Sequence, residues 1–269
     1  MWISALVLVL TGCIPGSANS GDIDPEGNNV DVLDPAGDED GDGLTNAEEL
    51  EHGADPLLWD TDGDTYGDGD EIFEGTDPAD AESRIYIGYW PYYRAKTELA
   101  DPGFGGTFAI GDSVGNQVGK DQFGDRVNLY DFAAEGTDYD LILIDVSAVW
   151  CVPCNYTSEW LATGADTMGF EGPFGAVREA VDAGTVQWVT VLPQAADHGP
   201  ASPQDIREWD EAYPHENVPV ILDKEGDFVA GLINYTGFWP SAMVVDAQTM
   251  EILSMGGVPD ALADVLAEL

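Results

Sequence analysis

Two cysteines three positions apart, Cys151 and Cys154, are the residues of this chain best suited to chemistry. They closely follow the aliphatic run 141–146, and a continuous run of this kind is typical of a buried parallel strand. Pro153 suits the first turn of a helix, where a missing N–H costs nothing. Cys151 is therefore expected at a helix N-terminus, where the partial positive charge favours a thiolate, and the pair is predicted to form and break a disulfide.

The surrounding residues resemble a known family. Trp-Cys-x-Pro-Cys at 150–154, with Asp145 six residues before the first cysteine, is similar to the thioredoxin family. Residues 121–132 resemble the redoxin branch, which comprises membrane-tethered thiol–disulfide oxidoreductases. Residues 237–246 resemble the cis-proline loop of the family and the strand that follows it. The resemblance covers roughly residues 105–269.

This resemblance implies an α/β, thioredoxin-like fold, a central mixed sheet flanked by helices. It implies that Cys151 attacks a substrate disulfide, that Cys154 resolves the mixed disulfide, and that Asp145 accepts and returns the proton of Cys154. Protein thiols and disulfides would be the substrates, a separate redox partner would be needed, and no metal or organic cofactor would serve the redox chemistry. Trp239 and Ser241 depart from the residues usual in the family, which bears on substrate preference. The residues expected to border the substrate groove are Trp150, Pro153, Trp239 and Pro240.

Other interpretations of the cysteine pair remain open. A Cys-x-x-Cys pair can supply half of a zinc site, but such a site needs about four ligands, and neither Cys13 nor any histidine stands at ligand spacing. The pair can also be a structural disulfide, Asp145 a solvated acid at a strand end, and Pro240 an ordinary trans proline. A peroxiredoxin is disfavoured because residues 147–150 lack its motif, and a copper-delivery protein because the cysteine spacing is one residue short.

The first residues indicate export. Residues 1–12 are predicted to be a lipoprotein signal peptide, because the first ten are almost wholly apolar and Leu-Thr-Gly-Cys, ending at Cys13, resembles a bacterial lipobox. Cys13 would carry a lipid anchor to the bacterial cell envelope, more in keeping with the outer membrane, facing the periplasm or the cell surface. The alternative is a plain secretory signal that leaves Cys13 as a free thiol. Residues 13–36 lack a hydrophobic period and are expected to form a flexible tether.

Two similar acidic blocks follow, at residues 38–49 and 60–71. Each places carboxylates at positions one, three, five and twelve of a loop. Gly43 stands at position six of the first loop, where the chain must turn sharply, and Thr65 replaces it in the second. The blocks resemble thrombospondin type 3 repeats, relatives of the EF-hand loop, in which oxygen ligands on alternate residues wrap a hard cation.

The resemblance implies that residues 37–82 hold structural Ca²⁺, which would stiffen a stalk rather than take part in catalysis. Extracellular calcium modules bind with a Kd of about 10⁻⁴ to 10⁻³ M. The alternative is a solvated acidic spacer without metal. The candidate ligands are Asp38, Asp40, Asp42, Leu44, Glu49 and Asp55 in the first block and Asp60, Asp62, Asp64, Tyr66, Glu71 and Asp77 in the second.

The net charge of −44, from 52 acidic and 8 basic residues, is shared by both halves of the chain. A surface this acidic argues against nucleic acid or anionic lipid headgroups as partners. Having only three cysteines, one a lipid site and two a redox pair, suits an exported protein without structural disulfides. The alternative function, from another class, is a calcium-stiffened surface lipoprotein whose thioredoxin-like domain is a binding or adhesion module.

The chain is thus predicted to place its repeats at 37–82 and a thioredoxin-like domain at 83–269. The aromatic-rich stretch 83–104 is expected to add a strand or to form an arm that covers the core. Strands and helices should alternate through the domain. Helices are expected from Pro153, from Pro203, and at 173–183 and 258–269, and strands at 186–192, 219–222, 242–246 and 251–254.

Overall fold

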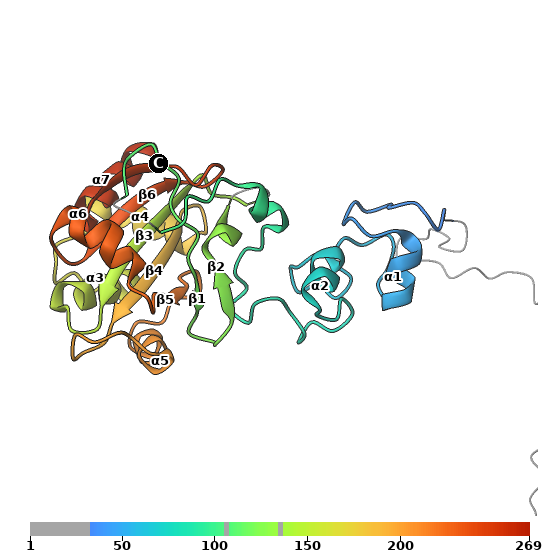
Figure 1. The fold of residues 1–269 in the computed structure, drawn as a ribbon, viewed down its shortest axis with the longest axis horizontal. Helices are drawn as coiled ribbons and strands as arrows, with labels where there is room; N and C mark the ends of the chain where they lie inside the picture. The colour runs from blue at the N-terminus through green and yellow to red at the C-terminus, as the bar shows by residue number, and fades with distance from the viewer. Residues whose placement is uncertain (1–32, 105–107, 134–136) are drawn as a thin grey trace, which may run out of the picture. The chain divides into compact units, whose positions relative to one another are not determined.

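The structure, a computed structural model, describes residues 33–104, 108–133 and 137–269 (Figure 1). It separates into two compact units, Met1–Ser83 and Arg84–Leu269. The predicted signal peptide, Cys13 and most of the predicted tether lie outside the described residues. Within the described ranges, no helix is both long enough and apolar enough to cross a membrane.

The first unit contains two short helices, each preceded by an acidic loop. Helix α1 (Asn46–His52) is capped at its N-terminus by the side chain of Thr45, and helix α2 (Asp68–Glu74) follows the second loop. Both helices end at a glycine with positive φ, Gly53 at 86° and Gly75 at 90°. Residues with a side chain pay a steric cost in this conformation, so glycine is favoured at both positions. The two repeats therefore share one loop–helix–glycine pattern.

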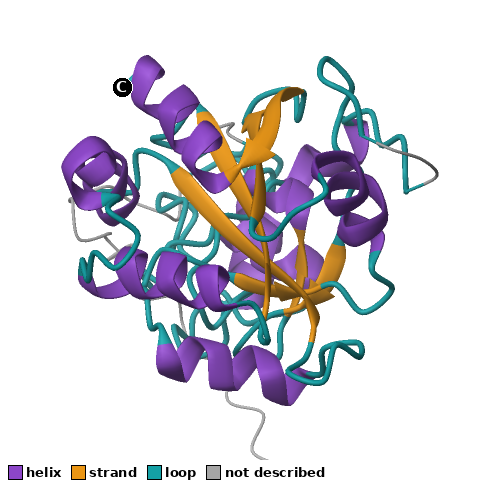
Figure 2. Ribbon diagram, turned by 90° about the vertical axis from the view of Figure 1, so that its left-hand side faces the viewer, coloured by secondary structure: helices purple, strands orange, loops and turns teal. Residues whose placement is uncertain are grey.

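The second unit is built on a five-stranded sheet in the order β5-β4-β3-β6-β7. The central strand β3 (Leu141–Ala148) pairs in parallel with β4 (Gln187–Gln194), and β4 pairs in parallel with β5 (Val220–Leu222). On the other side, β6 (Ser241–Asp246) is antiparallel to β3, and β7 (Ile252–Gly257) is antiparallel to β6. Figure 2 shows the helices around these twisted strands. The mixed sheet flanked by helices is a thioredoxin-like fold, as expected.

Four helices of the second unit pack on one face of the sheet. Helix α3 (Val152–Thr163), α4 (Glu171–Asp182) and α7 (Val258–Glu268) form one buried cluster with β3 and β6. Helix α5 (Pro203–Ala212) packs through Ile206 and Trp209 against β4 and β5 in an adjoining cluster that also holds both cysteines. The π-helical turn η4 (Val229–Ile233) and the short α6 (Asn234–Thr236) precede β6. These helices and strands fix the ends of β3 and β6, between which the site lies.

The aromatic-rich stretch forms an arm and not an added strand. Its only regular element is the 3-10 helix η2 (Arg94–Glu98). The arm is held to a segment that contains a small two-stranded sheet, β1 (Val118–Lys120) with β2 (Arg126–Asn128), and the 3-10 helix η3 (Leu129–Phe132). Three carboxylates of that segment accept hydrogen bonds from the arm: Asp131 from Tyr86 Oη (2.6 Å), Asp125 from Ile87 N (2.7 Å) and Asp121 from Trp90 Nε1 (2.7 Å).

The expected strands and helices of the core are present, with shifted ends. Helix α4 begins at Glu171, before the expected start at residue 173, and β7 extends to Gly257, beyond the expected end at residue 254. The β1–β2 pair was not expected, because each strand has only three residues and no alternating pattern of its own.

Candidate functional site

Cys151 and Cys154 lie where β3 ends and α3 begins. Cys151 is the N-cap residue of α3, and its Sγ is joined to that of Cys154 in a disulfide. The main-chain N–H of Cys154 also points at Cys151 Sγ, with an N–S distance of 3.2 Å. Both cysteines are buried, whereas Val152 between them is 58% exposed. The sulfurs thus lie just below the surface, at a helix end that stabilises negative charge.

Asn155 fixes the turn that carries the cysteines, which sequence reasoning missed. Its side-chain nitrogen donates to the main-chain oxygens of Cys151 (2.6 Å) and Val149 (3.2 Å). Its Oδ1 accepts a hydrogen bond from Tyr213 Oη (2.7 Å), in the residue that follows α5. The turn is therefore tied to a distant part of the chain. The only sequence signal was an asparagine directly after the second cysteine.

Asp145 is fully buried in β3, so it is not a solvated acid at a strand end. Burial raises the pKa of Asp145 to about 7, because the charged carboxylate loses its hydration, while a hydrogen bond from Ser147 opposes part of this rise. Ser147 Oγ donates to Asp145 Oδ2 at 2.8 Å. A carboxyl group with a pKa near neutrality takes up and releases a proton readily around pH 7.

The residues expected to border the groove gather around the cysteines. Trp150 and Trp239 both pack against the cluster that contains Cys151 and Cys154. Their rings lie 5.6 Å apart in a T-shaped arrangement, and Trp150 Nε1 donates to Gln194 Oε1 (2.9 Å). The Trp239–Pro240 peptide bond is cis, directly before β6. Pro153 is exposed beside Val152 in the first turn of α3.

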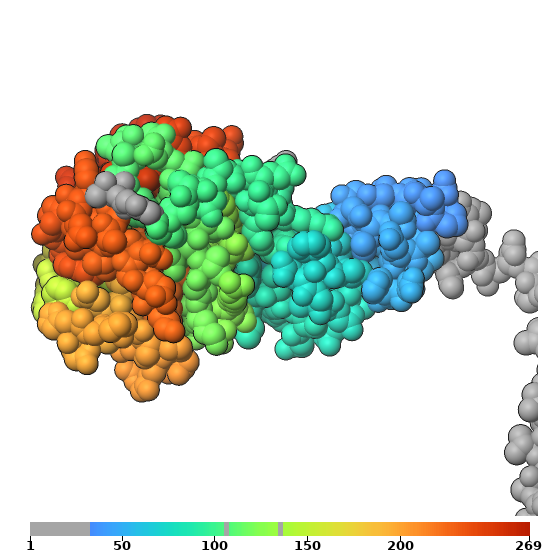
Figure 3. All heavy atoms as spheres, viewed as in Figure 1, coloured from blue at the N-terminus to red at the C-terminus, as the bar shows by residue number. Residues whose placement is uncertain are grey.

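His198 joins this aromatic group, although no role was predicted for it from the sequence. Its ring lies 4.5 Å from the ring of Trp150, and its side chain is exposed. The loop that carries it closes through hydrogen bonds from Ala195 N to Gly199 O and from Ala201 N to Pro193 O, each 2.9 Å long. Figure 3 shows the gold surface of the segment after β4 beside the orange surface of the segment that precedes β6. Contacts between such distant segments carry no signal in the sequence.

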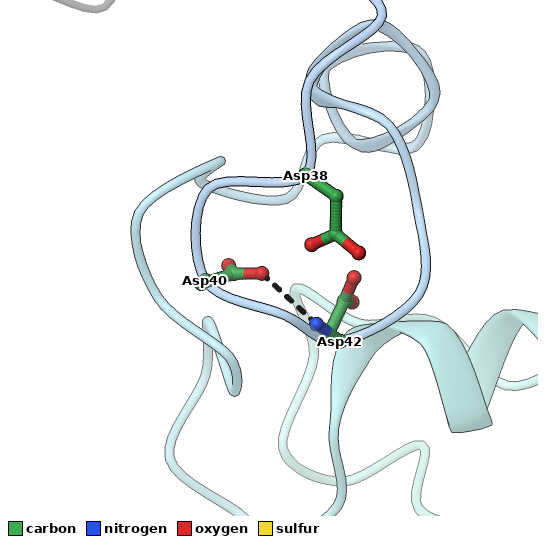
Figure 4. A group of neighbouring side chains, drawn as sticks. All are labelled: Asp38, Asp40 and Asp42. Carbon is green, nitrogen blue, oxygen red and sulfur yellow. Dashed lines mark hydrogen bonds between the residues drawn. The ribbon is translucent and has the colours of Figure 1, made fainter.

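The first acidic loop brings three carboxylates together. One oxygen each of Asp38, Asp40 and Asp42 lies within 4.8 Å of the others. Figure 4 shows these side chains pointing toward one another, with Asp42 N donating to Asp40 Oδ1 (3.2 Å). The second loop forms the same kind of group from Asp60, Asp62 and Asp64. Such groups of carboxylate oxygens are the ligands that hard cations prefer.

A further group joins the two repeats, and it contains a residue that the sequence analysis did not select. Asp68, at the start of α2, lies with Asp42 and Glu49 of the first repeat, and one oxygen of each is within 4.8 Å of the others. All three side chains are buried. Asp68 also accepts hydrogen bonds from Thr61 N (2.8 Å) and Thr61 Oγ1 (2.6 Å). Asp68 occupies position nine of its loop, and this position in the sequence could have identified it as a candidate ligand.

Burial and mutual repulsion disfavour the charged form of several carboxyl groups in the repeats. Burial, followed by the repulsion of neighbouring carboxylates, raises the pKa of Glu49 to about 8. Burial is also the main cause that raises the pKa of Glu71 to about 8 and that of Asp68 to about 6. The first 83 residues contain no Lys or Arg, so no lysine or arginine of the first unit neutralises these carboxylates.

The remaining candidate ligands have other contacts. Asp55 and Asp77 lie outside the carboxylate groups found among the described residues. Each closes a turn, Asp55 Oδ1 by accepting from Leu57 N and Asp77 Oδ1 by accepting from Ala79 N, both at 3.2 Å. At position seven of the loops, Leu44 N and Tyr66 N donate to Asp42 (2.8 Å) and Asp64 (3.0 Å). Glu71 Oε1 accepts from Thr76 Oγ1 at 3.0 Å.

Comparison with known proteins identifies the acidic blocks. Residues 38–58 and 60–81 match the family model of the bacterial TSP3 repeat, which confirms their resemblance to thrombospondin type 3 repeats. No curated protein matches the chain.

Solved structures similar to the chain include a thiol:disulfide interchange protein from Bacteroides sp., with 19% identity over 60% of this chain and 90% of that chain, at a TM-score of 0.40. A putative thiol:disulfide interchange protein DsbE from Chlorobium tepidum has 18% identity over 60% of this chain and 96% of that chain, at a TM-score of 0.40. The exposed lipoprotein thioredoxin Etrx1 from Streptococcus pneumoniae has 21% identity over 57% of this chain and 99% of that chain, at a TM-score of 0.37.

Proposed function

We propose that this chain is an exported thiol–disulfide oxidoreductase of the redoxin branch, which acts through Cys151 and Cys154. The observation that carries the proposal is the placement of this disulfide at the N-terminus of α3, following a strand that buries Asp145. Perturbed pKa values cluster at functional sites, so the buried carboxyl group of Asp145, with a pKa of about 7, favours a reactive disulfide over a purely structural one. The substrates are protein thiols and disulfides.

In the reducing direction, the thiolate of Cys151 attacks a substrate disulfide and forms a mixed disulfide, and one substrate sulfur leaves as a thiolate. Cys154 then attacks Cys151 Sγ, which closes the Cys151–Cys154 disulfide and releases the second substrate sulfur. Asp145 takes the proton of Cys154 during this step. Two electrons pass to the substrate, and a redox partner must later return them. In the oxidising direction the same steps run in reverse.

A trapping experiment on the full chain tests the proposal. Replacing Cys154 by Ser leaves Cys151 able to attack but removes the group that resolves the mixed disulfide. Cys154→Ser should therefore accumulate covalent complexes with substrate proteins that dithiothreitol releases, whereas Cys151→Ser should accumulate none. Equal recovery with both variants would contradict the assignment of Cys151 as the nucleophile.

The reduction potential decides the direction of electron flow. Equilibration with glutathione or dithiothreitol, followed by quantification of free thiols, gives this value. A potential of about −270 mV, as in thioredoxin, indicates a reductase, and about −120 mV indicates an enzyme that installs disulfides. If no reversible two-electron transition occurs, the calcium-stiffened binding or adhesion module becomes the better assignment.

We further propose that the repeats hold structural Ca²⁺. Within the part of the chain that the structure describes, several buried carboxylate oxygens lack a hydrogen-bond donor and support this, namely both oxygens of Glu49 and one each of Asp40, Asp62 and Glu71. These hard oxygen ligands fit calcium, and the first unit offers no Lys or Arg to neutralise them. Asp68 extends the expected ligand set, because it places a carboxylate of the second repeat beside Asp42 and Glu49 of the first.

Calorimetry tests the calcium proposal. Titration of the metal-free chain with CaCl₂ should show saturable binding, and chelator should lower the melting temperature of the first unit. Magnesium at the same concentration should stabilise less, because it demands a smaller octahedral site. Melting that is indifferent to chelator would leave the acidic spacer as the explanation.

We also propose that Cys13 carries a lipid that anchors the chain in a bacterial cell envelope, more in keeping with the outer membrane and facing the periplasm or the cell surface. The lipobox-like residues up to Cys13 support this. The acidic surface makes the membrane a partner through the anchor alone, and it disfavours nucleic acid. Expression with a labelled fatty acid should mark the wild-type chain and leave Cys13→Ala unmarked.

A further inference from the structure

Strand β3 contains two polar side chains, Asp145 and Ser147, in an otherwise aliphatic strand. They are two residues apart and therefore point to the same face of the sheet. Both are fully buried, at 0% exposure. The exchange steps above use Asp145 and give no role to Ser147. A buried hydroxyl costs free energy unless it is hydrogen-bonded, so its partner is informative.

The hydrogen bond between these residues makes the two carboxyl oxygens of Asp145 different. Ser147 Oγ donates to Oδ2 at 2.8 Å, and within the described residues Oδ1 has no hydrogen-bond donor. The hydroxyl of serine has one proton to donate, and Oδ2 accepts it whether the carboxyl is charged or carries its proton on Oδ1. A proton arriving at Asp145 is therefore directed to Oδ1.

The surroundings of Asp145 contain few groups that compete with Ser147. Across the sheet it lies opposite Thr190 of β4 and Ala242 of β6, neither of which titrates. Helices α3, α4 and α7 cover this face with apolar side chains, and Glu171 and Arg178 of α4 pair with each other. The titratable groups that the covering segments bring to this face are Cys154, which packs in one cluster with Leu192, and Tyr213 and His215, which line a crevice with Thr190.

We propose that Ser147 is a positioning residue for the exchange reaction: its hydroxyl holds Oδ2 of Asp145 and leaves Oδ1 to take the proton of Cys154. The proposal rests on the proposed oxidoreductase function. The pairing of β3 with β4 shifts register between Val146 and Ala148, at Ser147 itself. Ser147 thus stands at the irregularity itself, directly after the last regular pair, Val146 with Val191, and before the chain turns toward Cys151.

In the resolving step, the proton and the electron pair pass only between Cys154, Asp145, Cys151 and the substrate. The Cys154 thiol loses its proton to Asp145 Oδ1 as its sulfur bonds to Cys151 Sγ. The bond between Cys151 Sγ and the substrate sulfur breaks, and the substrate leaves as a thiolate with the electron pair. Ser147 keeps its own proton throughout, because it donates a hydrogen bond and exchanges nothing. No further oxidant or reductant enters the step.

Infrared titration of the oxidised full chain tests the geometry without requiring catalysis. The C=O band of protonated Asp145 is the carboxyl band that disappears in Asp145→Asn. In Ser147→Ala the carboxylate loses its one donor, so the midpoint of this band should move upward by about one pH unit. Ser147→Thr keeps the hydroxyl and should leave the midpoint near that of the wild type. An unchanged midpoint in Ser147→Ala would overturn the proposal.

Kinetics of the resolving step test the role. A mixed disulfide is formed on Cys151 with a small thiol, and its resolution by Cys154 is followed against pH. If the midpoint of Asp145 rises by about one pH unit, the fraction of deprotonated Asp145 falls roughly tenfold at pH values below the midpoint. The pH profile of resolution in Ser147→Ala should therefore move with the infrared midpoint. In an Asp145→Asn background, Ser147→Ala should cause no further shift. A shift of equal size without the carboxyl group would show that Ser147 acts elsewhere and would overturn the proposal.

The two arms separate failure of this proposal from failure of the proposed function. If wild-type chain shows no thiol exchange but the infrared midpoint moves in Ser147→Ala, the hydrogen bond stands and the oxidoreductase function falls, and with it the role of Ser147. If exchange proceeds normally and its pH profile is the same in Ser147→Ala as in the wild type, the function stands and the role of Ser147 falls.

Discussion

The two units of this protein bury carboxylates in different ways. In the repeats, Glu49, Glu71 and Asp68 are buried near other acids and far in sequence from any Lys or Arg. In the thioredoxin-like unit, Asp145 is buried alone in an aliphatic strand, with one hydroxyl beside it. Burial raises the pKa of the carboxyl groups in both units. The same desolvation thus acts on several neighbouring carboxyl groups in one unit and on a single carboxyl group in the other.

The difference lies in what can relieve the buried charge. Several oxygens that converge within 4.8 Å can share a divalent cation, so the repeats offer a place for metal. A single carboxyl group among apolar side chains cannot recruit a cation and is relieved by taking a proton. Grouping thus suits buried acids to act as ligands, as proposed for the repeats, and isolation suits Asp145 to carry a proton.

The largest expected effect separates the two units functionally. Cys151→Ser removes the nucleophile, so turnover of a disulfide-bonded peptide should fall to the uncatalysed rate. Cys13→Ala, which changes the remaining cysteine, should retain full turnover. The stabilisation of the repeats by calcium should be the same in both variants. Residual turnover well above background in Cys151→Ser would show that the cysteine pair is not the reactive centre.

The next effect concerns the isolated acid. The folded-state pKa of Asp145 is about 7 and its ordinary value is 3.8, so the proton on Asp145 stabilises the fold fully below the ordinary pKa. This stability is lost as pH rises through about 7, and the total is about 4 kcal/mol. Asp145→Asn cannot ionise, so relative to the wild type it should gain about this free energy of unfolding between pH 4 and roughly 8. Chemical denaturation at several pH values measures it.

The control for this prediction is Asp140→Asn, which removes an exposed carboxylate just before the same strand. Its difference in unfolding free energy from the wild type should stay flat over the same pH range. If Asp145→Asn is equally flat, the carboxyl of Asp145 is hydrated in solution and the contrast between the two units fails.

A smaller effect concerns the grouped acids. With a Kd of about 10⁻⁴ M, roughly 10 mM calcium is a hundredfold excess and should stabilise the first unit by about 2.7 kcal/mol. Glu49→Gln removes a buried carboxylate and should lose most of this gain in scanning calorimetry. Glu51→Gln changes an exposed acid of the same helix and should keep it. Equal losses in the two variants would mean that net charge and not ligand geometry governs the repeats.

The smallest effect compares the two repeats with each other. Gly43 and Thr65 occupy the same loop position with φ of 93° and 88°. A β-branched residue pays a steric cost at such an angle, so Thr65→Gly should stabilise the first unit by about 1 kcal/mol in the presence of calcium. Gly43→Thr should destabilise it by a similar amount. A lower melting temperature for Thr65→Gly would show that the threonine side chain contributes more than its backbone strain costs.

Much of the candidate site around the cysteine pair could be predicted from local sequence. The aliphatic run before Cys151 indicated a buried strand, and Pro153 indicated a helix start, and the structure has both. The burial of Asp145 followed from the same run. What could not be predicted depends on tertiary geometry. His198 reaches Trp150 only because a loop with specific hydrogen bonds folds back, and Asn155 meets Tyr213 across the fold.

The repeats show the same boundary between local and tertiary information. The spacing of acids within each loop indicated the groups at Asp38 and Asp60, because alternate residues of one turn face inward. The group that contains Asp68 joins two repeats and depends on how α2 returns to the first loop. The aromatic stretch 83–104 was ambiguous because Gly88 and Pro91 interrupt it, and its arm is fixed by carboxylates from residues 121–131.

The carboxylates that hold the arm have a mechanical consequence. A chain anchored near its N-terminus transmits tension into the second unit at Arg84, and the first attachments that it meets are Tyr86 to Asp131, Ile87 to Asp125 and Trp90 to Asp121. These polar bonds bear load before the hydrogen bonds of the central sheet do. If Cys13 anchors the chain as proposed and a bound partner pulls on it, the arm should yield first, and the strand that leads into the cysteine pair should keep its register until the arm has detached.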